Sequence, residues 1–387
     1  MPHADQTRHL VLATQPTFGC DPELFIESGG QIVESSTVVE EGGIRLGTYN
    51  NSKIVRDGVQ VELNPEAGPC RAELGNEISR LFRKLRDTLR SAGAQPSFKS
   101  VITLSDVEME RLSAASKVLG CARSKNLYNK RSSVNVGKDF RTRSAGGHIH
   151  LGVHHTLGVD LLKLPKWDER LVALLDILVG NTCVLIDRDP MAAERRKTYG
   201  RAGEYRLPTF GLEYRVLSNF WLRAYPLMSF VTGMSRLAVN ILVGSALRDI
   251  QMKNLPHPDY VSSLLTYDHV PKIPLDWDWE TELLSVTSPL KIRKAINTND
   301  LTLAQENWKA VKNFIDQYVI DSYYSLNYGN MEAFEYFAQM VQEKGLEYWF
   351  PNDPMTEWCE LDDGHGNGWE SFLYGTVGWQ MRKAKAA

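Results

Sequence analysis

Cysteine is scarce in this 387-residue sequence, which contains five cysteines, Cys20, Cys70, Cys121, Cys183 and Cys359. They are isolated, odd in number and form no C-x-x-C pair. This pattern excludes a disulfide framework and argues against a structural zinc site. It is typical of a reducing compartment, so we expect a cytoplasmic protein.

Long hydrophobic runs are also lacking. The two most apolar stretches, residues 171–186 and 227–247, are interrupted by Asp176 and Asn181 and by Arg236 and Asn240. A membrane span needs about 20 mostly apolar residues. We therefore expect two buried core helices and no membrane partner. The first residues likewise lack the basic and long apolar regions of a signal peptide.

The charges show no excess of either sign that would point to a partner. Lys and Arg number 44 and Asp and Glu 47, so the formal net charge is −3, which weighs against nucleic acid as a partner. Hydrophobic residues are 43% and charged residues 24% of the chain, as in ordinary globular proteins, which excludes wholesale disorder.

Hydrophobic periodicity predicts an α+β chain. Strand-like alternation is expected over residues 18–33, 58–65, 97–104, 147–153 and, in short pieces, 199–220. Helices are expected over residues 71–90, 167–186, 230–252, 303–324 and 331–344, and a loop over 349–369. Prolines between residues 256 and 274 predict a surface crossing. We therefore expect a catalytic domain over residues 1–270 and a mainly helical segment packed on it over 271–387.

Polar side chains recur at strand spacing in four segments. These carry Asp21 and Glu23, then Gln60, Glu62 and Asn64, then His148 and His150, and finally Glu213 and Arg215. Residues i and i+2 of a strand point to the same face of the sheet. If the four strands belong to one sheet, three or four carboxylates and two imidazoles converge on its polar face.

Carboxylates with one or two imidazoles suit Mg²⁺ or Mn²⁺ better than zinc. Such a cluster usually serves phosphate chemistry, because the ions neutralise phosphate oxygens. Clustered arginines beside it predict a clamp for a polyphosphate or an acyl phosphate. They are Arg195, Arg196, Arg201, Arg206 and Arg215.

Each segment also has a purely structural interpretation. Asp21 and Glu23 are compatible with a solvated strand face, Glu62 with a cap of the turn before Pro65, and the H-x-H pair with ordinary histidines. Arg195 and Arg196 are compatible with a solvated helix face. The four segments in this order favour a functional site.

The ordered motifs D-x-E, V-E-L-N-P, G-G-H-I-H-L-G, Y-G-R-A-G-E-Y-R and G-L-E-Y-R-V-L-S-N-F-W-L resemble those of the phage-type carboxylate–amine ligases. This group, amidoligase type 2, is distantly related to glutamine synthetase and glutamate–cysteine ligase, and the resemblance covers residues 18–225. It implies a glutamine-synthetase-like curved antiparallel sheet with flanking helices, whose concave face holds ATP and two or three Mg²⁺ ions.

The resemblance also implies a role for each motif residue. The implied metal ligands are Asp21, Glu23, Glu62, His148 and Glu213. His150 is expected near the ATP phosphates, as are Arg196, Arg201 and Arg206, and the implied catalytic residues are Arg206 and Arg215. Asp21 stands where glutamine synthetase usually has Glu, and a further metal-binding Glu has no counterpart. Asn64 or Glu66 is an alternative ligand.

These residues predict a ligase that uses ATP and Mg²⁺ or Mn²⁺ to form an amide through an acyl phosphate. Its expected substrates are small-molecule or peptide carboxylates and amines, in the host cytoplasm if a phage encodes it. An oligomer is left open. Three alternatives remain: a guanidino or phosphagen-type kinase, a metal-dependent hydrolase, and an inactive ligase-like binding protein.

Overall fold

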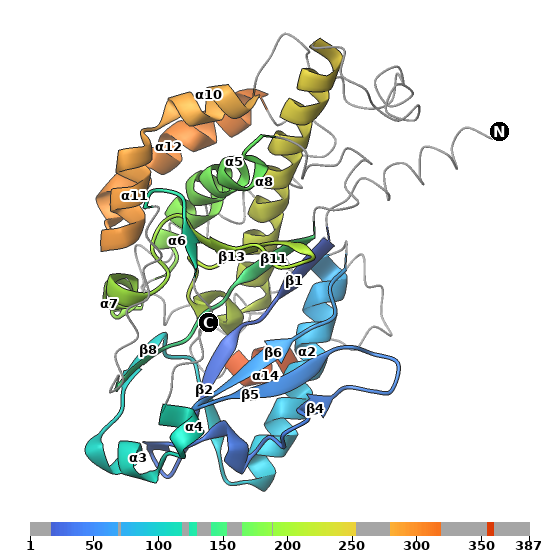
Figure 1. The fold of residues 1–387 in the computed structure, drawn as a ribbon, viewed down its shortest axis with the longest axis vertical. Coiled ribbons are helices and arrows are strands. Elements are labelled where there is room, and N and C mark those ends of the chain that lie inside the picture. Colours follow the sequence, from blue (N-terminus) through green and yellow to red (C-terminus); the bar gives the residue numbers. More distant parts are fainter. Residues whose placement is uncertain are drawn as a thin grey trace, which may run out of the picture.

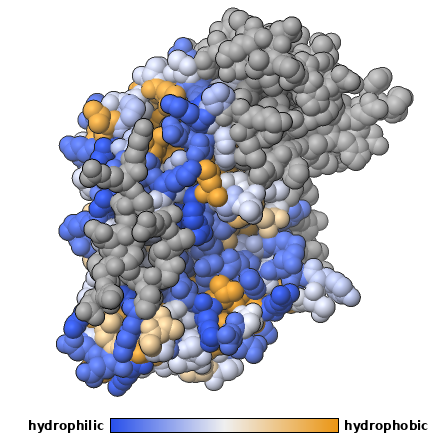
Figure 2. Space-filling view, viewed as in Figure 1, coloured by the Kyte–Doolittle hydropathy of each residue, from blue (hydrophilic) through white to orange (hydrophobic). Residues whose placement is uncertain are grey.

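The computed structural model describes residues 17–68, 71–117, 124–129, 141–152, 165–187, 189–252, 279–318 and 354–359. Within these ranges the chain is a mixture of helices and antiparallel strand pairs, as expected. Two sheets lie below a group of helices in Figure 1. The coloured part of the face in Figure 2 is largely hydrophilic, with small separate apolar patches.

The first sheet carries residues of the G-G-H-I-H-L-G motif and of the two motifs that contain arginine. Its strands, in spatial order, are β1 (Thr17–Cys20), β11 (Ile149–Gly152), β13 (Gly211–Tyr214), β12 (Glu204–Arg206) and β9 (Lys125–Asn126). His150 pairs with Gly19 on one side and with Glu213 on the other, and Glu213 pairs with Arg206. Directly opposed residues of antiparallel strands project to the same face, so this register gathers the polar side chains.

The second sheet carries the other two polar segments. Its strands are β3 (Gln31–Ile32), β2 (Glu23–Ser28), β6 (Gln60–Asn64), β5 (Lys53–Asp57) and β4 (Ile44–Arg45), and β7 (Gln95–Ser97) also pairs with β2. A separate pair joins β8 (Val101–Thr103) to β10 (Thr142–Ser144). Glu23 lies directly opposite Glu62, so these two carboxylates share a face.

The strand-like stretch predicted over residues 18–33 is found as three strands, β1, β2 and β3. It breaks between β1 and β2 at Asp21 and Pro22, and the chain passes there from the first sheet to the second. Proline has no N–H to donate to a strand ladder, so Pro22 suits such a crossing. The four polar segments are therefore divided between two sheets that meet at Asp21.

The helix α2 (Arg71–Ser91) confirms the amphipathic helix predicted at this place. It covers the second sheet (Figure 1), and its apolar residues are buried: Leu74, Ile78, Leu81, Phe82, Leu85 and Leu89. The short elements η1 (Ser35–Thr37), α3 (Asp106–Arg111) and α4 (Ala114–Lys117) lie at the periphery of this sheet. Ser105 and Glu108 form a capping box that starts α3.

The two apolar stretches form buried helices, as expected. The first runs through α5 (Trp167–Leu175), the π-helical turn η3 (Asp176–Gly180) and α6 (Asn181–Val184), and the second is α8 (Tyr225–Met252). The 3-10 helix η4 (Asn219–Arg223) precedes α8, where a strand was predicted through residue 220. Ser218 accepts a hydrogen bond from the Phe220 N–H and so caps this helix. Among the described residues, no helix combines the length and apolar character needed to cross a membrane.

The helices α10 (Trp279–Val286), α11 (Pro289–Thr298) and α12 (Leu301–Tyr318) pack against the helices of the body. Arg170 of α5 pairs with Glu280, and Asn307 donates a hydrogen bond to Asn181. The helix predicted from residue 303 is thus found. The helix predicted over residues 331–344, the proline-rich crossing and the boundary at residue 270 lie outside the described residues, so the division into two parts stays a prediction.

The loop predicted over residues 349–369 is wrong for one part, because α14 (Pro354–Cys359) is a helix. Pro354 occupies its first position, where the missing N–H has no partner to lose. Trp358 is fully buried, stacks on Phe82 with 5.4 Å between ring centroids, and donates its indole N–H to the Leu222 carbonyl. Tertiary burial therefore stabilises a helix that the local composition disfavours.

Candidate functional site

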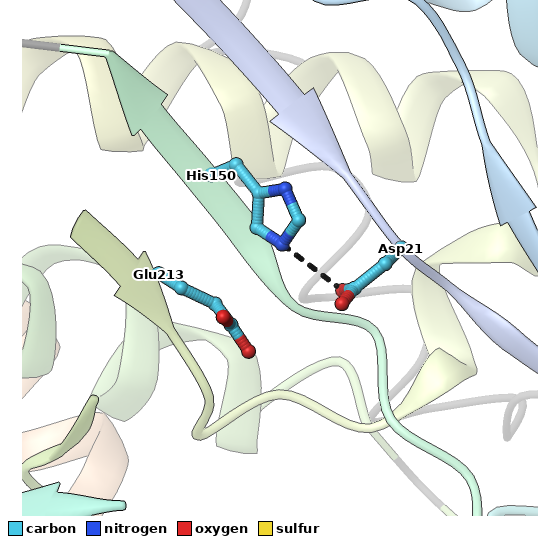
Figure 3. A group of neighbouring side chains, drawn as sticks. All are labelled: Asp21, His150 and Glu213. Carbon is cyan, nitrogen blue, oxygen red and sulfur yellow. Dashed lines mark ion pairs between the residues drawn. The ribbon is translucent and has the colours of Figure 1, made fainter. Parts of the chain in front are cut away.

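Three polar side chains converge where the two sheets meet. Asp21 follows β1, His150 lies on β11 and Glu213 on β13, and Figure 3 shows their side chains directed toward one another. One donor atom from each lies within 4.8 Å of the other two. His150 Nε2 is 3.3 Å from Asp21 Oδ1. The antiparallel register of the first sheet therefore produces the convergence expected from the sequence spacing.

His148 is the fourth member of this group. Its Nδ1 lies 3.0 Å from Asp21 Oδ1 and 3.6 Å from Glu213 Oε1. Four atoms at the centre are buried and have no hydrogen-bond partner among the described residues: Asp21 Oδ1, His148 Nδ1, His150 Nε2 and Glu213 Oε1. Buried polar atoms are normally paired. We define these four residues as the metal cluster, because two carboxylates and two imidazoles with such atoms suit Mn²⁺ or Mg²⁺.

Glu23 and Glu62 lie beside the metal cluster on the second sheet. Glu23 Oε2 accepts hydrogen bonds from the Gly146 N–H at 2.6 Å and from Gln60 Nε2 at 2.9 Å. Burial raises the pKa of Glu23 to about 8, and the charges of Asp21 and Glu62 act in the same direction. Burial and the charge of Asp21 raise the pKa of Glu62 to about 7. A bound cation would favour the ionised form of both carboxyls.

The charges inside the metal cluster also shift one another. Burial alone would raise the pKa of Asp21, but the neighbouring imidazoles of His148 and His150 lower it well below its ordinary value. Burial lowers the pKa of His148, whereas the charge of Asp21 raises the pKa of His150 despite burial. His148 is thus favoured in its neutral form, which is the form that binds metals.

Two of the predicted arginines contact Glu213. Arg206 Nε donates a hydrogen bond to Glu213 Oε2 at 2.5 Å, and a second nitrogen of the same guanidinium pairs with that oxygen. Arg215 Nε lies 3.1 Å from Glu213 Oε1, and another Arg215 nitrogen donates to Ser124 Oγ at 2.7 Å. The Arg206 side chain is 37% exposed and that of Arg215 4%. Arg206 therefore lies at the rim of the site and Arg215 at its floor.

The other three predicted arginines contact structural groups. Arg195 is buried, not on a solvated helix face, and donates to the Val216 and Leu217 carbonyls. Arg196 lies on α7 (Ala192–Thr198), is buried, donates to Asn299 Oδ1 and lies 3.9 Å from Asp187. Arg201 donates to the carbonyls of Arg196 and Lys197 at the end of α7. Their roles in phosphate binding stay predictions.

Asn64 and Glu66, the two residues predicted as alternative metal ligands, differ in their surroundings. Asn64 hydrogen-bonds to the carboxyl group of Glu62 and so lies beside the second-sheet carboxylates. Glu66 accepts a hydrogen bond from Asn51 in an exposed loop. Asn64 is therefore the better situated of the two.

Sequence reasoning missed several residues that support the site. Tyr199 is the most connected: its hydroxyl lies 2.8 Å from His148 Nε2, and the guanidinium carbon of Arg215 lies 4.9 Å from its ring centroid. Gly146 orients Glu23 together with Gln60, which the sequence already placed among the polar strand residues. Tyr199 opens the Y-G-R-A-G-E-Y-R motif, but a single aromatic residue carries no pattern from which a position beside His148 could be read.

Phe210 forms an apolar part of the rim. It is 41% exposed, and its ring centroid lies 5.1 Å from that of His150. The rim therefore combines an aromatic ring with the guanidinium of Arg206.

Comparison with known proteins gives one family match. The family model described as "Phage phiEco32-like COOH.NH2 ligase-type 2" matches residues 105–263. This range includes His148, His150, Arg206, Glu213 and Arg215 and ends before the C-terminal helices. No curated protein matches the chain.

Among solved structures, a bifunctional glutathione synthetase from Pasteurella multocida is similar at 10% sequence identity and a TM-score of 0.37. The match covers 97% of this chain and 54% of that one, so this chain spans about half the length of the synthetase. A structure of apo GmaS without ligand is similar at 13% identity and a TM-score of 0.34, covering 81% of this chain and 70% of that one. Neither structural likeness is close enough to support a function.

Proposed function

Residues 105–263 match the model of the phage-type COOH-NH2 ligase type 2 family, and from this match we propose an ATP- and Mg²⁺-dependent ligase that acts through an acyl phosphate. The family match agrees with the resemblance read from the motifs and supports a carboxylate–amine ligase. The use of ATP, the metal and the intermediate are the parts that we propose.

One observation carries this proposal: four buried atoms of metal-binding type, without a hydrogen-bond partner among the described residues, meet beside two guanidinium groups that share Glu213. Asp21, His148, His150 and Glu213 would hold one divalent ion, and Glu23 with Glu62 would hold a second. When bound, Mg²⁺ or Mn²⁺ neutralises phosphate oxygens and orients them. The arginines supply positive charge that the metal cluster itself lacks.

The reaction would proceed in two steps. An oxygen of the substrate carboxylate attacks the terminal phosphorus of ATP, which releases ADP and leaves an acyl phosphate. The amine nitrogen then attacks the carbonyl carbon and releases phosphate. Arg206 at the rim would bind the phosphate chain, and Arg215 at the floor would stabilise the charge that develops on the transferred group.

The proposal extends to the setting of the enzyme. We propose that residues 1–270 form the catalytic unit with the helical segment 271–387 packed on it. We also propose that the substrates are small-molecule or peptide carboxylates and amines of the cytoplasm. Arg196 and Arg201 would contribute to phosphate binding less directly, because Arg196 donates a hydrogen bond to Asn299 and Arg201 donates one to the Arg196 carbonyl.

The test is a screen of acid and amine pools for ADP formation, followed by labelling. With an ¹⁸O-labelled acid, we expect one ¹⁸O in the released phosphate and a product with the mass of acid plus amine minus water. Glu213→Gln should be inactive, whereas Glu194→Gln, an exposed position on α7, should match wild type.

Other outcomes would contradict the proposal. A product one phosphate heavier than the acid or amine, with no free phosphate, would indicate a kinase. Cleavage of an amide to acid and amine without ATP would indicate a hydrolase. ADP and phosphate formation without any amide product, when acid and amine are both present, would contradict a ligase mechanism.

A further inference from the structure

Tyr199 contacts His148 at the ring nitrogen that does not face the metal cluster. The hydroxyl lies 2.8 Å from His148 Nε2, whereas Nδ1 faces Asp21 and Glu213. The tyrosine and histidine rings meet edge to face, with centroids 5.7 Å apart. Both residues are buried, His148 almost completely. Water is thus a poor substitute for this contact.

This geometry has a consequence for metal binding. A cation bound at His148 Nδ1 uses the lone pair of that nitrogen, so the ring proton must lie on Nε2. A buried N–H without an acceptor is costly. The Tyr199 oxygen provides the acceptor. We infer that Tyr199 is a positioning residue that fixes His148 in its metal-binding form, an inference that rests on the metal site of the proposed function.

The backbone around Tyr199 holds the hydroxyl in place. Tyr199 ends α7, and its N–H donates to the Arg195 carbonyl. Gly200 follows with φ of +74°, in the left-handed region that favours glycine, and its N–H donates to the buried carboxylate of Glu204 at 2.9 Å. Both sides of Tyr199 are therefore anchored by backbone hydrogen bonds.

The ring of Tyr199 has a second contact that the hydroxyl does not share. The guanidinium carbons of Arg195 and Arg215 lie 5.0 and 4.9 Å from the ring centroid. Phenylalanine keeps this aromatic face and removes only the hydroxyl. Tyr199→Phe therefore separates the contact to His148 from the contact to Arg215.

The experiment titrates the whole protein with Mn²⁺ alone and follows free Mn²⁺ by electron paramagnetic resonance. Loss of an outer partner of a metal-binding histidine typically weakens metal affinity 10–100-fold, so we expect Tyr199→Phe to bind Mn²⁺ about tenfold more weakly. The matched control is Tyr205→Phe. Tyr205 is also buried, but its hydroxyl donates to Asp168 outside the cluster, so this variant should stay within twofold of wild type.

A second measurement covers the case in which Tyr199→Phe does not fold. Histidine ¹⁵N spectra of the Mg²⁺-loaded wild type, assigned with His148→Asn, should show His148 with its proton on Nε2. A proton on Nδ1 would overturn the inference. Equal Mn²⁺ affinity of folded Tyr199→Phe and wild type would also overturn it. A wild type that binds no Mn²⁺ would instead remove the metal site itself, and with it the proposed function.

Discussion

Metal binding at Glu23 and Glu62, beside the metal cluster, should become tighter as the pH rises from 6 to 8. Glu23 and Glu62 have pKa values raised to about 8 and about 7, chiefly by burial and by neighbouring carboxylates. Both must lose a proton to bind a cation. The pKa of His150 is also raised, by the charge of Asp21. A cation that binds His150 must therefore displace its proton, which also weakens binding at low pH.

The size of the effect follows from the two carboxyl groups. Below its pKa, each displaced proton weakens apparent affinity about tenfold per pH unit. Between pH 8 and pH 6, Glu23 would contribute about 50-fold and Glu62 about tenfold if both bind the ion. If both carboxyls bind, the two factors multiply to about 500-fold, and a single participating carboxyl gives only its own factor.

The assay is a Mn²⁺ titration at pH 6, 7 and 8, combined with calorimetry in buffers of different ionisation enthalpy to count released protons. Glu23→Gln should remove the larger part of the pH dependence. Glu27→Gln is the matched control on the same strand, because Lys99 and other hydrogen-bond partners lower the pKa of Glu27 despite partial burial. An affinity that does not change between pH 6 and 8, without proton release, would refute this reasoning.

Three further predictions follow from the same geometry. Without metal, the free energy of unfolding by urea should decrease from pH 5 to 8, because raised pKa values at Glu23 and Glu62 make the native state bind more protons than the unfolded state; a rise would contradict this. Arg215→Lys keeps the charge but loses the planar fork that reaches Glu213 and Ser124, so ADP formation should fall at least about a hundredfold; turnover within threefold of wild type would exclude the assigned role. Gly147→Ala should lower stability by about 1–3 kcal/mol and lower Tm, because its Cβ would collide with the Ser218 carbonyl and Trp221; an unchanged Tm would show that the backbone yields.

Much of the metal cluster could be predicted from local sequence, because its geometry depends on strand periodicity. His148 and His150 share a face by their spacing, and the antiparallel pairing of β11 with β13 brings Glu213 opposite His150. The apolar face of α2 was equally readable, since helical periodicity is a local property.

The parts that could not be predicted depend on long-range contacts. The crossing at Asp21 and Pro22 divides the polar segments between two sheets, and strand spacing alone does not reveal which strands pair. The helix α14 exists because Trp358 packs on Phe82, 276 residues away in sequence. Tyr199 reaches His148 through the fold of the segment after α7, which no motif spacing specifies.

The most direct test of the central claim is calorimetric titration of the wild type with ATP, with and without Mg²⁺, alongside Glu213→Gln. Glu213 is fully buried between His148, Arg206 and Arg215, so its charge should be essential to a phosphate-handling metal site. We expect the wild type to bind ATP only when Mg²⁺ is present. The Glu213→Gln variant should remain folded but should not bind ATP. A folded wild type that binds no ATP, or binds it equally well without Mg²⁺ and without the Glu213 carboxylate, would contradict the account.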